Sequence, residues 1–359
     1  MIELPNDCRL VFCVGVGGVG KTTFAAALAL REARRGKSVL VLTADPARRL
    51  ADALGIRGLG DTPSHISLPA GRAGGTLHAA MLETKASADE IIRRAANDDL
   101  RAQRVFENRI YQAFSHTLAR SHAYAAMERV HATLHDRRYE LVVVDTPPAQ
   151  SSIEILDAPA RLVQFLDQRV VRWFLKASDE SAQLRGGALT QSLLRIVAGD
   201  SLVSALTGFL TEMAFLRDGF SQRAGEVRDF MRSSSTQFVL VSSADSPGVE
   251  AAASVAVELH DRGFELAHVV FNRAFIPEIS GTPRGPVSYP DRLSRLAPKL
   301  ARIRALLTSE EDQKHTNMLA FIGEHRIAAW AFPEANRPLG DTSALAAWIE
   351  QGRPIGGPP

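Results

Sequence analysis

Nine consecutive residues near the start of this 359-residue chain have the types and spacing of a phosphate-binding loop. The run Gly15-Val16-Gly17-Gly18-Val19-Gly20-Lys21-Thr22-Thr23 fits the pattern G-x-x-x-x-G-K-[ST] without a mismatch. Glycines at these places let backbone N–H groups turn toward phosphate oxygens, an approach that side chains would block. Lys21 is expected to reach the β- and γ-phosphates, and the Thr22 hydroxyl to take a Mg²⁺ coordination position. The sequence therefore predicts a nucleoside triphosphate site with contacts from Gly17, Gly18, Val19, Gly20, Lys21, Thr22 and Thr23.

The segments on either side of this loop favour the same interpretation over a glycine-rich turn with a chance lysine. An apolar, β-branched run from Leu10 to Val14 precedes the loop, and an alanine- and leucine-rich run from Phe24 to Leu30 follows it. A phosphate loop requires strand, loop and helix in this order, with the positive end of the helix dipole behind the phosphates.

Two aspartates come directly after further strand-like segments. Asp45 follows residues 37–43 and precedes Pro46, so we expect it on a loop rather than inside a helix. Asp145 follows residues 140–144, a continuous apolar run that is typical of a buried parallel strand. Ligands of parallel sheets bind at the carboxyl ends of strands, so both carboxylates are expected beside the loop, with Asp145 as the second Mg²⁺ group. For Asp45, a simple helix cap explains these residues equally well.

The order of strand-like and helix-like segments predicts an α/β fold, with a doubly wound, mostly parallel sheet and a large helical insertion. We expect one P-loop domain over residues 1–359, with core segments at approximately 8–60, 138–152 and 235–350 and helical segments at approximately 76–135 and 153–233. In the last core segment, strands are predicted at 237–241, 267–271 and 327–332, with a helix at 248–262. Residues 55–75 are expected to be an irregular connection, and residues 353–359 a disordered tail.

Composition narrows the class of protein without naming a partner. Hydrophobic residues make up 45% and charged residues 23% of the chain, as in ordinary soluble proteins. The net charge of +2 argues neither for nor against nucleic acid binding, and no other feature favours a nucleic acid partner. Residues 1–7 lack a signal-peptide pattern, and the chain shows no basic amphipathic anchor. We therefore expect a cytoplasmic protein with no direct membrane anchor, in which Cys8 and Cys13 stay reduced.

Three landmarks together resemble the ArsA family of ATPases, which contains arsenite-pump ATPases and the ATPase that targets tail-anchored proteins. They are the loop Gly15–Thr23, the strand end Thr43-Ala44-Asp45-Pro46-Ala47, and the strand end Val143-Val144-Asp145-Thr146-Pro147-Pro148. Residues 121–128 and 165–167 extend the resemblance to a bacterial branch of uncharacterised ArsA-like proteins. The resemblance spans nearly the whole chain.

The resemblance implies an ATPase that uses Mg²⁺, works as a dimer, and opens and closes a helical subdomain with nucleotide state. It implies that Asp45 orients the attacking water, that Asn272 reads the adenine, and that Phe332 and Pro333 cover the base. For Asn272 a turn-forming role is the alternative, and for Phe332 core packing is equally plausible. The second helical segment would face a hydrophobic client segment or a membrane protein, although plain bundle packing explains its apolar residues more simply.

This chain also departs from the family pattern. The family carries a lysine after the first glycine of the loop, where it reaches the partner's phosphates, and this chain has Val16. A homodimer is then expected to hydrolyse ATP slowly, because such trans-acting cations are worth about 10³ to 10⁵ in rate. Arg48 or Arg49 could substitute, a lysine-bearing paralogue could form a heterodimer, or the chain could be a catalytically weak regulatory subunit. Two cysteines are too few for the family's arsenite or zinc sites, which makes an arsenite or anion pump-driving ATPase a weaker alternative.

Overall fold

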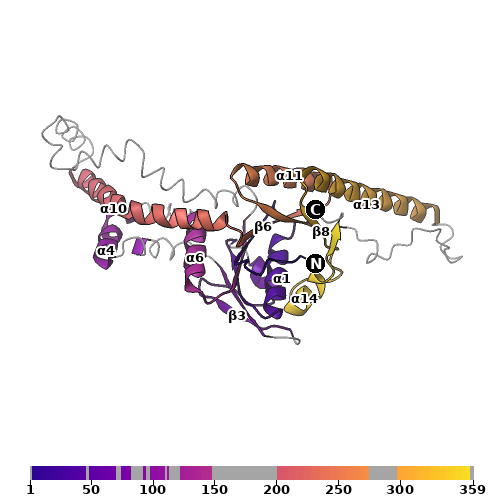
Figure 1. The fold of residues 1–359 in the computed structure, drawn as a ribbon, viewed down its shortest axis with the longest axis horizontal. Helices are drawn as coiled ribbons and strands as arrows, with labels where there is room; N and C mark the ends of the chain where they lie inside the picture. The colour runs from indigo at the N-terminus through magenta and orange to yellow at the C-terminus, as the bar shows by residue number, and fades with distance from the viewer. Residues whose placement is uncertain are drawn as a thin grey trace. The chain divides into compact units, whose positions relative to one another are not determined.

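The computed structural model divides the chain into two compact units, which we describe separately (Figure 1). Unit 1 comprises Met1–Met81, Arg138–Ser152 and Met231–Pro359, and unit 2 comprises Leu82–Arg137 and Ile153–Phe230. The structure describes residues 2–45, 48–69, 74–81, 92–93, 98–109, 111–112, 122–147, 200–274 and 297–355. Residues 153–199 of the predicted helical segment 153–233, which include the motif 165–167, lie outside the described residues, as do Pro46, Ala47 and Pro148.

The strands of unit 1 form one sheet in the order β3-β4-β2-β5-β1-β6-β7-β8-β9. They are β1 (Leu10–Val14), β2 (Ser38–Thr43), β3 (Ser64–Ile66), β4 (Thr76–Met81), β5 (Leu141–Asp145), β6 (Thr236–Ser243), β7 (Leu266–Asn272), β8 (Ala328–Ala331) and β9 (Arg353–Ile355). Every neighbouring pair from β4 to β8 is parallel, and only the edge strands β3 and β9 pair antiparallel. The predicted α/β fold with a mostly parallel sheet is confirmed.

β1 occupies the point of the sheet where the direction of winding reverses. It pairs with β5 on one side and with β6 on the other, with the chain continuing outward through β2 on the first side and through β7 and β8 on the second. Open α/β sheets bind ligands outside the carboxyl ends of their strands at such a point. The loop that follows β1 therefore lies at the favoured ligand position of this fold.

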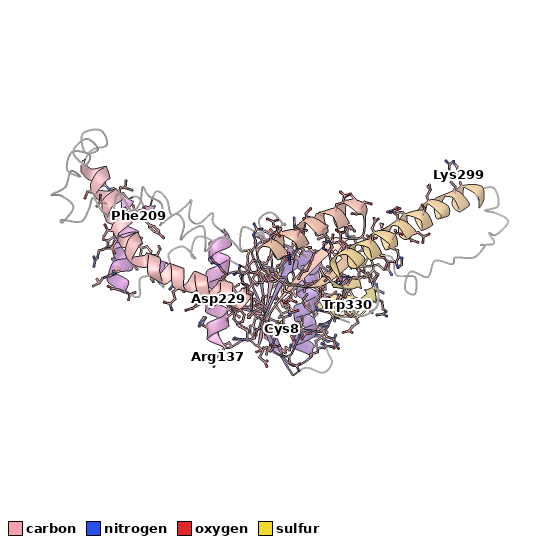
Figure 2. The ribbon with its side chains drawn as sticks, turned by 45° about the horizontal axis from the view of Figure 1, so that its top comes forward. Cys8, Arg137, Phe209, Asp229, Lys299 and Trp330 are labelled. Carbon is pink, nitrogen blue, oxygen red and sulfur yellow. The ribbon has the colours of Figure 1, made fainter. Side chains whose placement is uncertain are left out.

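Helices cover both faces of the sheet (Figures 1 and 2). Successive side chains along a strand such as β1 point to opposite faces. Val11 and Cys13 belong to the core cluster formed with α1 (Lys21–Arg34), whose apolar residues from Phe24 to Leu30 are all buried. A helix that is apolar on every side is suited to such a position, and α1 also contacts α2 (Arg49–Leu54) and α14 (Thr342–Ile349).

Aromatic side chains mark the opposite face of the sheet. Phe12 of β1 stacks on Phe238 of β6 with ring centroids 5.1 Å apart. Phe271 of β7 meets Phe321 of α13 (Ala297–His325) edge to face at 5.8 Å. α13 also packs beside α11 (Ser246–Asp261), which contacts β6 and β7. The buried β1 strand is thus covered on both faces, as its continuous apolar sequence predicts.

The expectation that the first helical segment begins at residue 76 is wrong. Thr76–Met81 is β4, which pairs parallel with β2 in register from Ser38–Thr76 to Thr43–Met81. Its alanines favour a helix locally, but Leu77 and Ala79 are fully buried, and pairing with β2 overrides that preference.

Both sheet edges also differ from the sequence expectation. Ser64–Ile66, within the predicted irregular connection, forms β3 and pairs antiparallel with β4. Arg353–Ile355, within the predicted tail, forms β9 and pairs antiparallel with β8, while residues 356–359 lie outside the described residues. Strands of three residues carry too little hydrophobic periodicity to be recognised, because their partners define them.

Unit 2 contains α4 (Asp99–Glu107), α6 (His122–Asp136) and most of α10 (Asp200–Met231). The Asp98 side chain caps α4 by accepting a hydrogen bond from Leu100 N–H at 3.0 Å. Asn108 Nδ2 donates to the Ala205 carbonyl at 2.8 Å, and Arg104 pairs with Glu212 at 3.2 Å. Among the helices that the structure describes, none is long and apolar enough to cross a membrane.

Candidate active site

The loop between β1 and α1 leaves the N-terminal end of α1 open to a ligand. Gly20 precedes the helix in a left-handed conformation at φ 93°, and no side chain caps the helix there. The first N–H groups of a helix have no intrahelical partners and lie at the positive end of its dipole. Gly17 and Gly18 are exposed, whereas Val19 is buried beneath them. This arrangement presents backbone donors to an anion, as the sequence predicts.

Lys21 turns back over the loop and is only 7% exposed. Its Nζ donates a hydrogen bond to the Val16 carbonyl at 2.7 Å. Burial lowers the pKa of the Lys21 amine below its ordinary value, while the nearby Asp145 carboxylate opposes that shift. The Val16 side chain packs partly buried against the core beneath α1. The Lys21 amine is therefore turned inward onto the loop backbone. Position 16 carries an apolar side chain and no charge.

Asp145 is a fully buried carboxylate at the end of β5, directly across from Cys13 of β1. Burial raises the pKa of Asp145 to about 6, and hydrogen bonds from Thr22 and Thr43 oppose the increase. The Thr43 hydroxyl donates to Asp145 Oδ2 at 2.9 Å. Asp145 Oδ1 is buried without a hydrogen-bond partner among the described residues. A buried carboxylate oxygen without a hydrogen-bond partner, on a residue that lies close to Thr22, fits the needs of a hydrated Mg²⁺ ion.

Thr43 connects the two aspartates, a role that the sequence analysis did not assign. Its hydroxyl donates to Asp145 and accepts a hydrogen bond from the Asp45 N–H at 3.2 Å. The ends of β2 and β5 are therefore linked through one side chain that is 2% exposed. The signal in the sequence was a hydroxyl residue, Thr43, at the last position of β2 and two residues before Asp45.

Asp45 does not cap the next helix. The N-cap position of α2 belongs to Arg48, and no side chain makes a capping hydrogen bond there, so the cap interpretation of Asp45 is not realised. Asp45 instead pairs with Arg49 at 3.3 Å, with the Arg49 side chain 62% exposed. Lys21 and Asp45 are close enough to influence each other electrostatically. Arg49, one of the two predicted substitutes for a missing lysine, pairs with Asp45.

Asn272 ties the phosphate loop to the end of β7. Its Nδ2 donates to the Val19 carbonyl at 2.9 Å, and its Oδ1 accepts from the Arg273 N–H at 2.8 Å. The amide group has two N–H donors and two oxygen lone pairs, so one of each is left after these bonds. Contact with an adenine stays a prediction for this side chain, which is 8% exposed.

Phe332 takes the packing role that the sequence left open. Its ring is 1% exposed, meets Phe24 edge to face at 5.7 Å, and lies 4.9 Å from the Trp348 ring. The Pro333 carbonyl accepts a hydrogen bond from Trp348 Nε1 at 3.0 Å. A ring enclosed in this way has no open face for a base, so the expected contact of Phe332 with adenine is not supported by its packing.

Comparison with known proteins places this chain in a family. Residues 8–284 match the family model of the anion-transporting ATPases, of ArsA type. The chain belongs to this family. The ArsA resemblance inferred from three sequence landmarks is thereby confirmed. As an ArsA-family ATPase, the chain binds ATP through its P-loop and hydrolyses it.

Individual relatives share different lengths of this ATPase. The chain is 26% identical to ATPase get3 of Aspergillus terreus over 275 residues, which are 75% of this chain and 74% of that protein. It is 29% identical to Protein Rv2184c of Mycobacterium tuberculosis over 227 residues, or 59% of this chain and 51% of that protein. The Arsenical pump-driving ATPase of Escherichia coli is 31% identical over 154 residues, which are 43% of this chain and 23% of that protein. The match to the last two thus spans about half and about a quarter of their lengths.

Proposed function

We propose that the chain is a Mg²⁺-dependent ATPase switch that works as a dimer and uses ATP binding and hydrolysis to close and reopen its helical unit. The observation that carries the proposal is the grouping of Lys21, Asp45 and Asp145 around the open N-terminus of α1. Lys21 and the loop N–H groups would neutralise the phosphate charge. In-line attack by water on the γ-phosphate needs little further covalent chemistry from the protein.

Mg²⁺ would be held by the Thr22 hydroxyl and, through water, by Asp145. When bound, the ion would neutralise negative charge on the phosphates. The orphaned Oδ1 of Asp145 supports this assignment, because a buried carboxylate oxygen needs a cation or a donor nearby. Thr43 would keep that carboxylate oriented, since it holds the other oxygen at 2.9 Å.

Asp45 would orient the attacking water. It stands on the loop after β2, outside α2, and its ion pair with the exposed Arg49 is the kind of surface contact that opens at little cost. Opening of this ion pair would let the Arg49 guanidinium turn toward phosphate. The N–H bond to Thr43 connects this movement to Asp145 and hence to the metal position.

The helical unit would bind a client, for which a hydrophobic segment or a membrane protein is the proposed chemistry. We propose a homodimer or a heterodimer with a paralogue, located in the cytoplasm, with no nucleic acid partner. The match to ATPase get3 over 75% of this chain extends beyond the P-loop and supports a shared architecture for the proposed cycle.

A catalytically weak regulatory subunit is the second candidate, and Val16 is the observation that favours it. Its side chain packs against the core and supplies no charge to a partner's phosphates. A pump-driving role, like that in the name of the Escherichia coli relative, is less well supported, because neither cysteine of this chain favours metal binding. Burial raises the pKa of Cys8 to about 11 and that of Cys13 well above its ordinary value, which disfavours the thiolates that soft metals require.

The test of the proposed function compares Asp45→Asn with the unmodified chain. We expect the rate of phosphate release to fall by about 10² to 10⁴, the range for loss of a group that positions or deprotonates the nucleophile. ATP binding should persist, because Lys21 and the loop are unchanged. Chelation of Mg²⁺ should stop hydrolysis in the unmodified chain.

Asp52→Asn is the matched control, since Asp52 is an exposed acidic residue in the same region, on α2. Its rate should equal that of the unmodified chain. A normal rate in Asp45→Asn would remove Asp45 from the mechanism. Rapid ATP hydrolysis by the unmodified chain, without a partner protein, would instead contradict the proposal that it is a regulatory subunit.

A further inference from the structure

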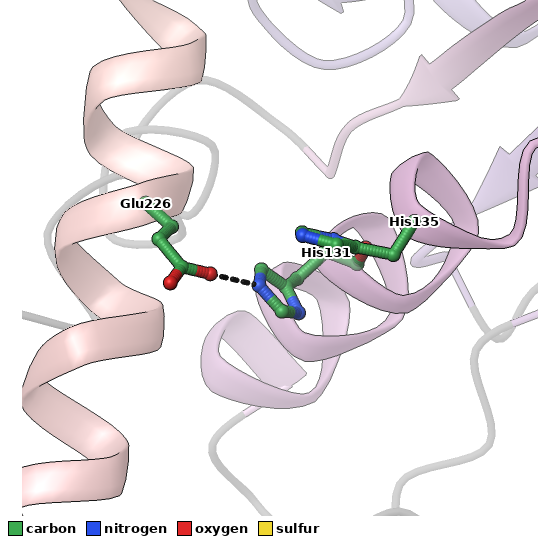
Figure 3. Close-up of side chains that lie close together, drawn as sticks. All are labelled: His131, His135 and Glu226. Atoms are coloured by element: carbon green, nitrogen blue, oxygen red, sulfur yellow. Dashed lines mark hydrogen bonds and ion pairs between the residues drawn. The ribbon is translucent and has the colours of Figure 1, made fainter.

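Three side chains in unit 2 lie close enough together to bind one metal ion. His131 and His135 are one helical turn apart on α6, and Glu226 approaches them from α10 (Figure 3). Their ligand-capable atoms all lie within 4.8 Å of one another. The nucleotide site uses none of these residues, because its groups belong to unit 1. The cluster therefore requires an explanation of its own.

Within the cluster, the side chains of His131 and Glu226 are in direct contact. His131 Nε2 lies 2.7 Å from Glu226 Oε2, and an ionised carboxylate only accepts, so this nitrogen carries the proton in the metal-free protein. A metal ion at Nε2 would take the place of that proton, which solvent can return to the ring at Nδ1. Ligand atoms of a tetrahedral site with bonds of 2.0–2.1 Å stand about 3.3 Å apart. The two atoms therefore need to separate by only a small movement.

Hydrogen bonds to neighbouring groups already orient the side chains of His135 and Glu226. His135 Nδ1 lies 2.9 Å from the His131 carbonyl, which can only accept, so Nδ1 donates and the lone pair is on Nε2. Gln222 Nε2 donates to Glu226 Oε1 at 2.9 Å and leaves Oε2 for a ligand. Metal-bound histidines commonly donate their second N–H to a backbone carbonyl, and metal-bound carboxylates are commonly hydrogen-bonded.

We propose that His131, His135 and Glu226 bind a divalent metal ion of the zinc class, with water as the fourth ligand. Two imidazoles and a carboxylate form a donor set that zinc uses with an open position, whereas Mg²⁺ and Ca²⁺ prefer oxygen ligands. The side chains of His131 and Glu226 are 15% and 40% exposed, which leaves room for water. Because the ligands come from α6 and α10, the ion cross-links two helices that are distant in sequence.

In the experiment, Zn²⁺ is titrated into the full chain after removal of any affinity tag. The buffer contains excess Mg²⁺, so that only sites that prefer Zn²⁺ are measured. Isothermal titration should show one saturable site per chain. Co²⁺ in its place should give the strong visible absorption of tetrahedral coordination. His135→Ala and Glu226→Gln should each weaken Zn²⁺ binding by about tenfold or more. Glu226→Gln keeps the size and a hydrogen-bonding oxygen of the side chain, so it separates ligand loss from misfolding.

His315→Ala is the matched control, since His315 is an exposed histidine of α13 in unit 1. Its Zn²⁺ affinity should equal that of the unmodified chain. The proposal is overturned if the folded, unmodified chain shows no saturable Zn²⁺ binding, or if both variants keep full affinity. These outcomes do not depend on ATP hydrolysis, so they are distinct from any failure of the proposed function.

Discussion

At the residue scale, two glycines of the phosphate loop, Gly18 and Gly20, share a similar φ but meet different neighbours. Gly18 and Gly20 both adopt positive φ, at 81° and 93°. A Cβ on Gly20 would collide with the Asn272 Nδ2 atom, which is held in place by its bond to the Val19 carbonyl. A Cβ on Gly18 would meet nothing within 4 Å. The pair therefore separates the cost of the backbone conformation from the cost of the contact.

We expect Gly18→Ala to lower the free energy of unfolding by about 1 kcal/mol, the usual cost of a side chain at positive φ. Gly20→Ala should cost about 1–3 kcal/mol more, because Asn272 must move and the Val19 carbonyl loses its donor. Chemical denaturation of both variants, followed by circular dichroism, measures the difference.

An Asn272→Ala background provides the control for this comparison. Without the amide, the two alanine variants should differ much less from each other in their free energies of unfolding. Equal costs for Gly18→Ala and Gly20→Ala in the unmodified background would show that the Asn272 contact does not restrain the loop.

How far the sequence predicted individual residues depends on whether a motif or a partner defines their role. Lys21 and Thr22 follow from the loop pattern alone, and Asp145 from the end of an apolar strand. The link made by Thr43 was not predicted, because it needs the register that sets β2 beside β5. Phe332 was ambiguous for the same reason: only the fold shows that Phe24 and Trp348 enclose its ring.

At the element scale, strands with long apolar runs were predicted and strands defined by pairing were not. β1 and β5 are buried along their length and β6 over residues 238–242, and their sequences indicate strands without further information. β4 contains alanines that favour a helix, and β9 contains a proline, so each becomes a strand through its neighbour. The same limit applies to β3 at the opposite edge.

The C-terminal end of α1 holds a buried ion pair that anchors the turn into β2. Arg31 donates to Glu32 Oε1 from Nε at 3.1 Å and from a terminal nitrogen at 2.8 Å, and Lys37 pairs with Oε2 at 3.1 Å. The Arg31 and Glu32 side chains are both almost fully buried. We expect Glu32→Gln to lower the free energy of unfolding at pH 7 by about 3–5 kcal/mol, because it leaves the Arg31 charge buried and uncompensated.

The loss should also depend on pH. Burial alone raises the pKa of the Glu32 carboxyl, but Arg31 and Lys37 outweigh burial and hold the pKa below its ordinary value of 4.5. A carboxyl with a lowered folded pKa stabilises the protein above its unfolded pKa and loses that effect as pH falls through the folded value. The stability difference between Glu32→Gln and the unmodified chain should therefore shrink below pH 4.5. Glu250→Gln, at an exposed position of α11, is the control, and a difference independent of pH would contradict the assignment.

At the scale of the whole molecule, the sheet order explains why one loop can gather groups from distant parts of the chain. β1 lies between β5 and β6, so Asp145 of β5 lies at one side of the loop and Asn272, at the end of β7, contacts it from the other side. The alternation of strands and helices predicts a doubly wound, mostly parallel sheet, but the order of its strands comes from the structure. The sequence of one chain does not define its partner in the proposed dimer. Position 16, which is Val16 here, is where the site would depend on that partner.

We expect Val16→Lys to raise the rate of ATP hydrolysis by up to about 10³, the lower end of what a trans-acting cation contributes. The rate per chain should rise with protein concentration, since the cation would act on the site of a second copy. Val16→Met is the control, because it adds length without charge and should leave the rate unchanged. Phosphate release measured over a range of chain concentrations gives both comparisons.

Mixing experiments decide whether the lysine acts across the dimer or within its own chain. A Val16→Lys, Asp45→Asn double variant should be inactive alone, because its own site lacks the group that positions water. Added to the unmodified chain, it should accelerate hydrolysis at the intact sites, to which it supplies the missing charge. A Val16→Met, Asp45→Asn variant should give no acceleration. If Val16→Lys is fast at every concentration and the mixture shows no gain, the cation acts in cis, and the proposed role of a partner at this site is wrong.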